Sequence, residues 1–309
     1  RSTRVRSSAA SDVYKRQPMD RAVLNSLIAG IYADYASSNR WQIRQRTNIV
    51  DEAPSSDIRE WSSNMFVQQV MKYTAGSLQD TGLLLNTSSR IYIPFVKLGD
   101  TSEYYHHDML HLLGSRGVDA LNNVMGLDKD SVVQTSVENV YLGMLDAYEK
   151  AGMDDGYVLC KLDYLNWKRN SDPTFVPYRA PQNLIGLTQD PYLTGLDKLK
   201  ADFKSHDVCA EVYLAKARYA VEKQQQVMAL QICDEAIRLY PDYKRINALK
   251  NLKQEILNPA LYVRADQVVY PDTDMKLMVN HKNIDGFTVQ LYQSKKRVAE
   301  QLSLIHISE

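Results

Sequence analysis

The spacing of apolar residues changes near Pro259, and this change constrains the fold more than any other feature of the sequence. Before Pro259, apolar residues recur every three or four positions over long stretches, which is typical of amphipathic helices. After it they alternate with polar residues, as in LYVRADQVVYP and GFTVQLYQ, with turn residues PDTD and DG between the runs. The sequence therefore predicts a mainly α chain followed by the start of an antiparallel β-sandwich, because these few strands cannot close a sandwich alone.

The sequences of the two ends of the chain differ in character from the rest. Residues 1–17 carry five basic side chains and no apolar period, and they lack the run of roughly 7 to 15 apolar residues that a secretory signal needs. SSAASDVYKRQ in this segment and LSLIHISE at residues 302–309 are similar to translated sequencing-adapter read-through. A basic nucleic-acid arm and a solvated tail are the alternatives for residues 1–17. We interpret both ends as adapter-like artefacts, expect residues 1–17 to be disordered, and take residues 18–301 as a natural fragment open at both ends.

Composition narrows the classes of function. The two ends hold five of the 37 basic and two of the 37 acidic residues, which leaves 32 basic and 35 acidic residues and a net charge of −3. A mildly acidic body does not indicate a nucleic-acid partner. No apolar run reaches the roughly 18 residues of a membrane span, although an upstream signal or lipid anchor stays open. The three cysteines form no CxxC pair and are predicted to be small core residues: Cys160, Cys209 and Cys233.

Residues 18–172 are predicted to form an N-terminal helical region. The first helix is expected to begin at Asp20, which would cap it, and to bury a stripe of large side chains. That stripe consists of Leu24, Leu27, Ile28, Ile31 and Tyr35. A second helix is expected from Asp57 to Gly76, with Glu60 completing a capping box. RIYIPFV is either a strand or an extended connection, because a proline interrupts it, and the next helix, EYYHHDMLHLLG, is expected to end at Gly114.

A helical hairpin ends this region and a repeat follows it. The hairpin pairs a helix over 131–151, stopped by Gly152, with YVLCKLDYLNWKR. Prolines at positions 173, 177 and 181 block helix continuation, so residues 173–189 are predicted to be a connection. Residues 190–258 fit a degenerate tetratricopeptide-like frame, with a last helix from Tyr243 to Leu257 covering the pair, and residues 259–301 supply the first β-strands. The frame positions are Tyr213, Ala217, Ala229, Cys233, Ala236 and Pro241, and Lys216 and Ala220 depart from the pattern.

The string HHDMLH is the one chemically suggestive motif. His107 and His111 stand at i and i+4 on one predicted helix face with Asp108 beside them, which is the geometry of a zinc pair. The glutamate of HExxH is absent, and spacing supplies no third ligand. We therefore favour a structural role in which His106, His107 and His111 cap or cover a helix, and keep His107 and His111 as weak metal candidates. The sequence holds no GxSxG, P-loop or GxGxxG, so we predict no catalytic residue and no cofactor.

The order of these parts resembles a known family. A helix at HDMLHLLGSRG, tetratricopeptide-like helices and the strand entry NPALYVRADQVVYPDTDMKLMVNHKNIDGFTVQLYQ are similar to the N-terminal part of the large alpha-2-macroglobulin-like proteins of Bacteroidetes-type bacteria. The most specific stretch is VVYPDTDMKLMVNHKNIDGFTVQLY, which is similar to the opening strands of the first macroglobulin-like β-sandwich of that family. The resemblance covers most of residues 18–301.

This resemblance implies a parent protein of the periplasm or cell envelope that inhibits proteases by entrapment after cleavage of a bait segment. Members with a thioester carry a C-x-E-Q motif, and this chain has Val212 and Ala236 where the glutamine would follow its two C-x-E strings. The fragment is therefore expected to be non-catalytic, with target proteases reached through other parts of the parent. Two alternatives remain, namely a helical-repeat adaptor and, third, a metal-dependent enzyme using His107 and His111.

Overall fold

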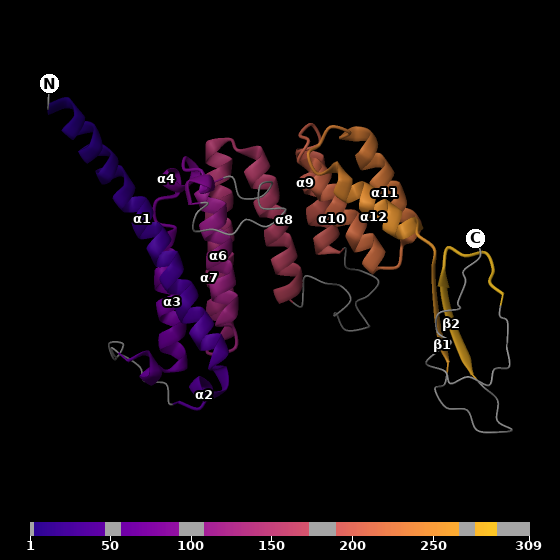
Figure 1. The fold of residues 1–309 in the computed structure, drawn as a ribbon, viewed down its shortest axis with the longest axis horizontal. Coiled ribbons are helices and arrows are strands. Elements are labelled where there is room, and N and C mark those ends of the chain that lie inside the picture. Colours follow the sequence, from indigo (N-terminus) through magenta and orange to yellow (C-terminus); the bar gives the residue numbers. More distant parts are fainter. Residues whose placement is uncertain (1–2, 47–56, 93–107, 173–189, 266–275, 289–309) are drawn as a thin grey trace, which may run out of the picture. The chain divides into compact units, whose positions relative to one another are not determined.

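The computed structural model describes residues 3–46, 57–92, 108–172, 190–265 and 276–288, and for residues 3–17 and Ala265 only the backbone. The described part of the chain is mostly helical, and a two-stranded antiparallel sheet follows its helices (Figure 1), which confirms the predicted succession of α and β structure at this level. It divides into two compact units, Arg1–Leu249 and Lys250–Glu309. The elements are α1 (Thr3–Ser38), α2 (Arg40–Arg44), η1 (Ile58–Glu60), α3 (Ser63–Ser77), α4 (Thr81–Leu85), η2 (Ser89–Tyr92), α6 (Met109–Asn123), α7 (Asp130–Ala151), α8 (Asp154–Ser171), α9 (Pro191–Asp202), α10 (Cys209–Glu222), α11 (Gln226–Leu239), α12 (Ile246–Leu257), β1 (Ala260–Ala265) and β2 (Leu277–Lys282).

Helix α1 differs from its prediction at both its start and its buried face. Its backbone is helical from Thr3, in place of the disorder expected before Pro18, so Asp20 lies inside the helix and does not begin it. Leu24 and Ile31 of the expected buried stripe are 57% and 62% exposed. Small side chains are buried instead, and they let α3 and α6 pack closely on α1. These are Ala22, Ser26, Ala29, Ala33 and Ala36. The artefact interpretation of residues 1–17 stays a prediction.

The next three elements begin and end at other residues than predicted. Asp57 does accept a hydrogen bond from a main-chain N–H, that of Arg59, but it caps the short turn η1, and the long helix α3 starts only at Ser63. Helix α3 also continues past Gly76 by one residue, because this glycine keeps helical geometry. Helix α6 starts later than expected and passes through Gly114. The first residues of RIYIPFV form the turn η2, and the rest of that string lies outside the described residues.

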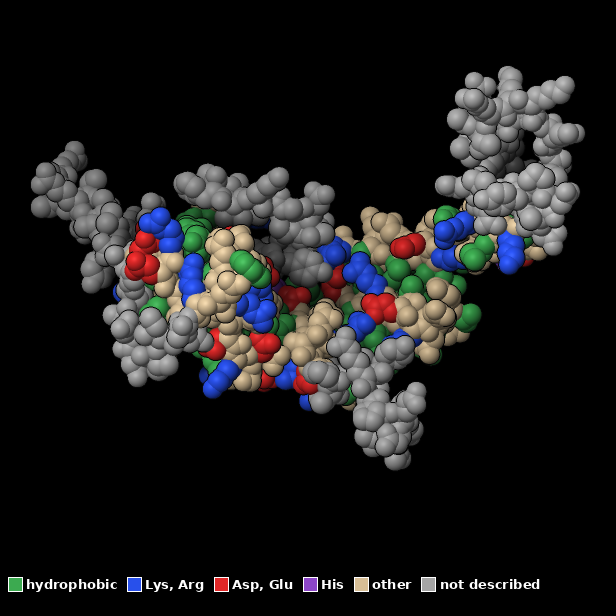
Figure 2. Space-filling model, turned by 90° about the horizontal axis from the view of Figure 1, so that it is seen from below, with side chains coloured by type: hydrophobic (Ala, Val, Ile, Leu, Met, Phe, Trp, Pro, Cys, Tyr) green, Lys and Arg blue, Asp and Glu red, His purple; other side chains and the backbone are tan. Residues whose placement is uncertain are grey.

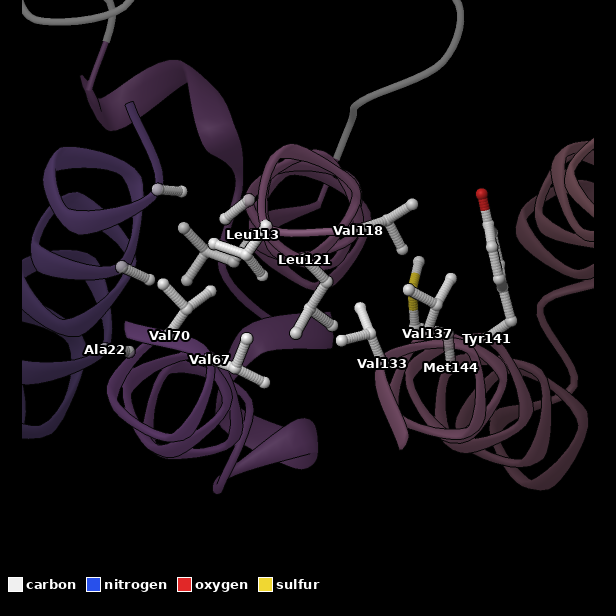
Figure 3. Packing of buried hydrophobic residues seen from close by; sticks show 14 of the residues in the cluster. Ala22, Val67, Val70, Leu113, Val118, Leu121, Val133, Val137, Tyr141 and Met144 are labelled. Atoms are coloured by element: carbon white, nitrogen blue, oxygen red, sulfur yellow. The ribbon is translucent and has the colours of Figure 1, made fainter. Parts of the chain in front are cut away.

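Helices α7 and α8 form the predicted hairpin. Gly152 ends α7 with φ of 64°, the left-handed conformation that glycine adopts most easily. Together with α1, α3 and α6 they enclose the main core (Figure 3), in which Val67 and Val70 of α3, Leu121 of α6 and Val137 of α7 are all buried. A core that spans these helices fixes where the polar side chains of α6, α7 and α8 meet.

Helices α9, α10 and α11 lie within residues 190–258, the stretch that was predicted to be a second helical region. Asp190 caps α9 by accepting from the backbone N–H groups of Tyr192 and Leu193, with proline at the first helical position. Helices α10 and α11 pack against each other, and the frame positions on them are buried: Tyr213, Ala217, Ala229, Cys233 and Ala236. In α12 the predicted apolar positions Ile246, Leu249 and Ile256 are buried as well.

The second unit holds the end of α12 and an antiparallel hairpin. Strands β1 and β2 pair with Val263 opposite Val279, which places Leu261 and Val263 of β1 on the same face as Leu277 and Val279 of β2. Val263 and Leu277 are exposed. Just after β2, Asn283 donates through Nδ2 to the carbonyl oxygen of Ile256, at 2.7 Å. The hairpin thus caps the carboxyl end of α12, while the third predicted strand falls largely outside the described residues.

The surface of the described residues mixes charges of both signs. On the face in Figure 2, lysine and arginine side chains alternate with aspartate and glutamate over the helices. Mixed charge of this kind gives little long-range attraction for a polyanion. Within the described ranges, we find no helix that is both long and apolar enough to span a bilayer.

Candidate functional site

The chemically richest part of the helical unit lies where α6 begins. Asp108 is the N-cap of α6, with extended backbone geometry, and its Oδ1 accepts from the His111 backbone N–H at 2.7 Å. This is the usual way in which a carboxylate satisfies an otherwise unpaired donor at a helix start. The Tyr148 hydroxyl of α7 donates to the same carboxylate, at 2.9 Å and 3.0 Å to its two oxygens. Asp108 is only 7% exposed, so the cap is a buried junction between α6 and α7.

His111 connects this junction to α8. Its side chain is 1% exposed, and Nε2 lies 3.2 Å from Oδ2 of Asp163, whose side chain is 38% exposed. An ionised carboxylate only accepts hydrogen bonds, so this contact requires the proton on Nε2. The ring also meets that of Tyr148 edge-on, with centroids 6.5 Å apart. Asp108, His111, Tyr148 and Asp163, which we call the α6 polar cluster, therefore tie three helices together.

The protonation states in this region oppose nucleophilic chemistry. Cys160 of α8 is fully buried, and burial, followed by the nearby Asp163 charge, raises the pKa of its thiol far above the ordinary value. Burial and the adjacent Asp108 carboxylate likewise raise the pKa of Tyr148. A reactive cysteine needs a lowered pKa and access to solvent. The Cys160 thiol and the Tyr148 hydroxyl therefore keep their protons and are buried. This arrangement is suited to holding the helices in register.

Only one histidine of the predicted pair lies within the described residues. His111 is inside α6 and contacts a carboxylate, whereas His106 and His107 lie outside the described residues. The pairing of His107 with His111 therefore stays a prediction. Within the described ranges, no group of three or more His, Cys, Asp or Glu side chains is arranged to hold a metal ion.

Sequence reasoning named Asp108 and His111 but missed their partners. Tyr148 and Asp163 are 40 and 52 residues away from the residues they contact. Tyr148 could have been found, because within the predicted helix over 131–151 it follows Tyr141 and Met144 at helical spacing, and a buried tyrosine hydroxyl needs a polar partner. Asp163 carries no such signal, since its position opposite His111 depends on how α8 packs on α6.

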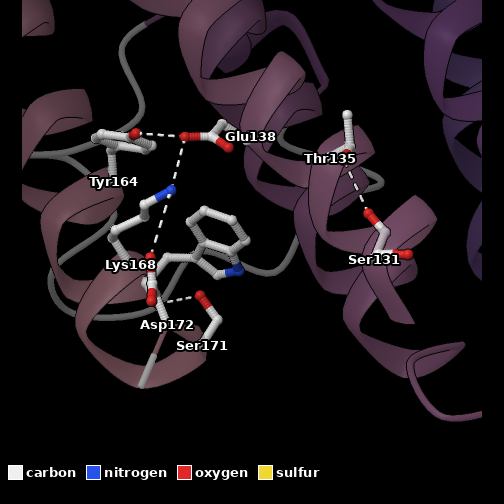
Figure 4. Close-up of polar contacts among 8 residues, drawn as sticks. Ser131, Thr135, Glu138, Tyr164, Lys168, Ser171 and Asp172 are labelled. Atoms are coloured by element: carbon white, nitrogen blue, oxygen red, sulfur yellow. Dashed lines mark hydrogen bonds and ion pairs between the residues drawn. The ribbon is translucent and has the colours of Figure 1, made fainter. Parts of the chain in front are cut away.

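A second polar group joins the outer faces of α7 and α8 (Figure 4). Glu138 of α7 accepts from the Tyr164 hydroxyl at 2.7 Å and from Lys168 Nζ at 2.9 Å. These hydrogen bonds lower the pKa of Glu138, with Lys168 the larger cause. Burial, and after it the hydrogen bond to Glu138, raises the pKa of Tyr164 to about 12. Asp172 lies 3.9 Å from Lys168 Nζ and extends the group to the end of α8.

A third group is buried in the second helical region. Glu211 of α10 is 4% exposed, yet its Oε1 lies 3.2 Å from Nη1 of Arg245 and 3.1 Å from the Tyr243 hydroxyl. The residues that precede α12 are thereby fixed to α10. Removing either member of this buried charge pair would leave the other charge buried without its partner, which is strongly destabilising.

Comparison with protein-family models, with curated proteins and with solved structures gives no match to this chain. The interpretation of the three polar groups therefore rests on their own geometry. The first two groups join two or more helices, the third joins α10 to the segment before α12, and in each the polar atoms are directed at other parts of the same chain.

Proposed function

We propose that this chain is the non-catalytic N-terminal part of a bacterial alpha-2-macroglobulin-like protein, whose parent acts as a cell-envelope protease inhibitor. The observation that carries the proposal is the hairpin that directly follows the helical region. Its Leu261, Val263, Leu277 and Val279 share one face, and Val263 and Leu277 are exposed there. A two-stranded sheet is marginal in water by itself. An apolar face of this kind suits a strand pair that belongs to a larger β-sandwich.

The polar groups support a structural role for the helical region. Asp108, His111 and Glu211 are buried, and the polar contacts of the α6 polar cluster and the Glu211 group join parts of the same chain. A region built in this way would position the following β domains of the parent. Capture of a target protease would then depend on bait and β-sandwich segments elsewhere in the parent, and the parent would act in the periplasm or at the cell envelope.

The coding DNA provides the direct test. Reading the gene outward past residue 301 and upstream of residue 18 should reveal a frame that continues into repeated β-sandwich domains, behind a signal or lipid-anchor segment. A frame that stops soon after residue 301, or that enters an unrelated domain, would overturn the proposal. As a biochemical companion, the purified chain alone should leave a protease fully active on a large protein substrate, whereas the parent should inhibit it.

The second candidate is a helical-repeat adaptor, which the packing of α10 against α11 favours. Ala217 and Ala229, the small positions of the tetratricopeptide-like frame, are both completely buried. On the outer side of α11, Val227 and Met228 are 71% and 48% exposed. If the chain is an adaptor, it should bind a peptide partner, and the double substitution Val227→Ser with Met228→Ser should release that peptide. If the chain is part of a protease inhibitor, the same double substitution should leave inhibition by the parent protein unchanged.

A further inference from the structure

Two Asp-Gly pairs occur in the sequence, and they lie in different surroundings. Asp155 and Gly156 belong to the first turn of α8, whereas Asp285 and Gly286 lie in the segment that follows β2. An aspartate followed by glycine is prone to cyclise onto its own backbone, because the glycine has no side chain to shield its nitrogen. Whether the ring forms depends on how freely the backbone of each pair can rotate.

The pair in α8 is held in place. Both residues have helical backbone geometry, and ring closure would require the ψ angle of Asp155 to leave the helical value of about −42°. The ring of Tyr148 also packs directly on Gly156, since a Cβ built on this glycine would overlap that ring. Ring closure at this pair therefore requires α8 to open locally and to separate from α7.

The pair after β2 is not held in this way. Asp285 and Gly286 are both exposed and belong to neither a helix nor a strand. A Cβ built on Gly286 would meet none of the described atoms within 4 Å. Gly286 also shares no main-chain hydrogen bond with another residue of the described ranges. Backbone with so few contacts rotates at little cost in free energy, so this pair can reach the geometry of ring closure in the folded chain.

Contacts on both sides anchor the residues that flank this pair. Before it, Asn283 has a left-handed φ of 53° and donates through Nδ2 to the carbonyl oxygen of Ile256, at 2.7 Å. After it, the ring of Phe287 packs near that of His281, with centroids 6.2 Å apart. The Asp-Gly pair is thus a short exposed link between two anchored residues, and a change in its length must displace one of them.

We propose that Asp285 is a modification site at which the chain forms isoaspartate spontaneously. The nitrogen of Gly286 attacks Cγ of Asp285, and the carboxyl hydroxyl leaves with the amide proton as water, which gives a cyclic succinimide. Water then adds to either ring carbonyl. Addition at the α-carbonyl carbon breaks its bond to the nitrogen and leaves Gly286 joined through Cγ, which is the isoaspartyl form. The reaction needs no enzyme, oxidant or cofactor.

The product lengthens the main chain between the two anchors. Cβ of Asp285 becomes a backbone atom, and the α-carboxylate that is set free keeps the charge of the residue. Because Asn283 is hydrogen-bonded to the end of α12, we expect the extra methylene group to displace Phe287 from His281. This modification depends only on the segment after β2, and it is independent of the proposed function of the chain.

The test ages the purified full chain in mildly acidic buffer and digests samples with trypsin. Asp285 then lies in the peptide of residues 283–295, and Asp155 lies in the peptide of residues 151–161. The aspartyl and isoaspartyl forms of a peptide have the same mass and separate by chromatography, whereas deamidation of Asn283 would change the mass. We expect the isoaspartyl form to accumulate at least about tenfold faster in peptide 283–295, because α8 must first open at the other pair.

Three controls establish why the two pairs differ. In chains aged in urea, where neither pair is held by structure, the two peptides should accumulate the isoaspartyl form at similar rates. Gly286→Val shields the nitrogen and Asp285→Glu would require a larger ring, so either change should stop accumulation in peptide 283–295. Both positions are exposed, and both variants should keep the unfolding midpoint of the parent chain. Asp155→Glu is the matched control and should leave accumulation in this peptide unchanged.

Each contrary result overturns a stated part of the proposal. A peptide 283–295 that stays a single species on ageing would refute the modification site. Equal accumulation in the two peptides of the folded chain would mean that the fold does not select Asp285. Accumulation that persists in both Asp285→Glu and Gly286→Val would place the change at another residue. The ring-proton resonances of His281 should double as the isoaspartyl form accumulates, and a single unchanged set would refute the displacement of Phe287.

Discussion

Helices α1 and α7 both carry a stripe of large apolar residues at helical spacing, but only α7 buries it. Val133 and Val137 of α7 are completely buried, whereas Leu24 and Ile31 of α1 are 57% and 62% exposed. The face that α1 does bury consists mostly of small side chains, four alanines and Ser26, with Met19 near its start. The position of a stripe on a helix therefore does not by itself decide which face becomes the core.

The partner helix explains this difference. Helix α1 packs mainly against α3, and the bulky side chains come from that side: Phe66 is completely buried and its ring stacks on Tyr35, with centroids 5.7 Å apart. The ring of Trp61, just before α3, packs on the ring of Tyr32, with centroids 4.8 Å apart. Cores are filled to nearly constant density, so large groups on α3 are matched by small groups on α1. Both helices of the pair therefore determine which face of α1 is buried.

The first prediction places an aspartate in the apolar stripe of each helix, and the substitution in α7 should cause the largest loss of stability. Val137→Asp would place a carboxylate in a completely buried site among apolar side chains, and we expect it to destabilise the protein by more than about 4 kcal/mol. Chemical denaturation followed by circular dichroism would measure this loss.

Ile31→Asp is the control, because it makes a comparable change at a position of α1 that is 62% exposed. We expect a change within about 0.5 kcal/mol. If Ile31→Asp were as damaging as Val137→Asp, the stripe on α1 would have to be buried in solution, and the comparison of the two helices would fail.

Local signals in the sequence predict much of the first unit. Gly152 ends α7 in the left-handed conformation, and Asp190 with Pro191 begins α9, because both act through their own backbone neighbourhood. The alternation after Pro259 predicts strands where β1 and β2 lie. These local signals fail where packing against other helices determines the structure. Asp57 offers a capping carboxylate, but only a short turn follows it, and the buried face of α1 depends on the residues of α3.

The candidate site shows the same limit. The HHDMLH motif drew attention to Asp108 and His111, but the predicted helix included Asp108, whereas in the structure Asp108 is its cap. Their meeting with Tyr148 and Asp163 follows from the crossing of α6, α7 and α8, which no spacing along the chain encodes. The packing of Met144 on Gly114 and of Thr74 on Gly117 could not be predicted either, since a glycine in a helix pattern does not indicate which side chain will pack on it.

The second prediction enlarges a small residue on the buried face of α1. Ala33 is completely buried, so Ala33→Leu adds volume where α3 and α6 are already close, and we expect a loss of about 1 to 3 kcal/mol. Asp34→Leu, at the next and exposed position, is the matched control and should change stability by less than about 0.5 kcal/mol. Urea unfolding of both variants gives the comparison. Equal stabilities would show that the alanine face is not tightly packed.

The third prediction compares one glycine of α7 with one glycine of α6. Gly143→Ala should stabilise the protein by about 0.5 to 1 kcal/mol, because the position is helical and none of the described atoms lies within 4 Å of the new Cβ. Gly114→Ala should gain less or lose stability, because its Cβ would displace the thioether of Met144. Thermal unfolding midpoints rank the two variants. The reverse order would mean that α7 does not rest on the α6 backbone.

The smallest expected effect tests the outer face of α7. Hydrogen bonds from Lys168 and Tyr164 lower the pKa of Glu138 below its ordinary value of 4.5. A carboxylate whose pKa is lowered by folding adds stability above its unfolded pKa and loses that contribution as the pH falls through the folded pKa. Both side chains of the Glu138–Lys168 ion pair are partly exposed, so Glu138→Gln should cost only about 0.5 kcal/mol near pH 7.

That cost should shrink toward zero as the pH is lowered from 5 to about 2, which urea unfolding of the two proteins across this range would detect. Asp146→Asn is the control, since its ion pair with Lys150 is exposed on both sides and should contribute almost nothing at any pH. A Glu138→Gln effect that does not vary with pH would mean that shape, and not charge, holds α7 to α8 at this point. Because α7 already buries its apolar stripe, the loss of this outer contact should leave the hairpin folded.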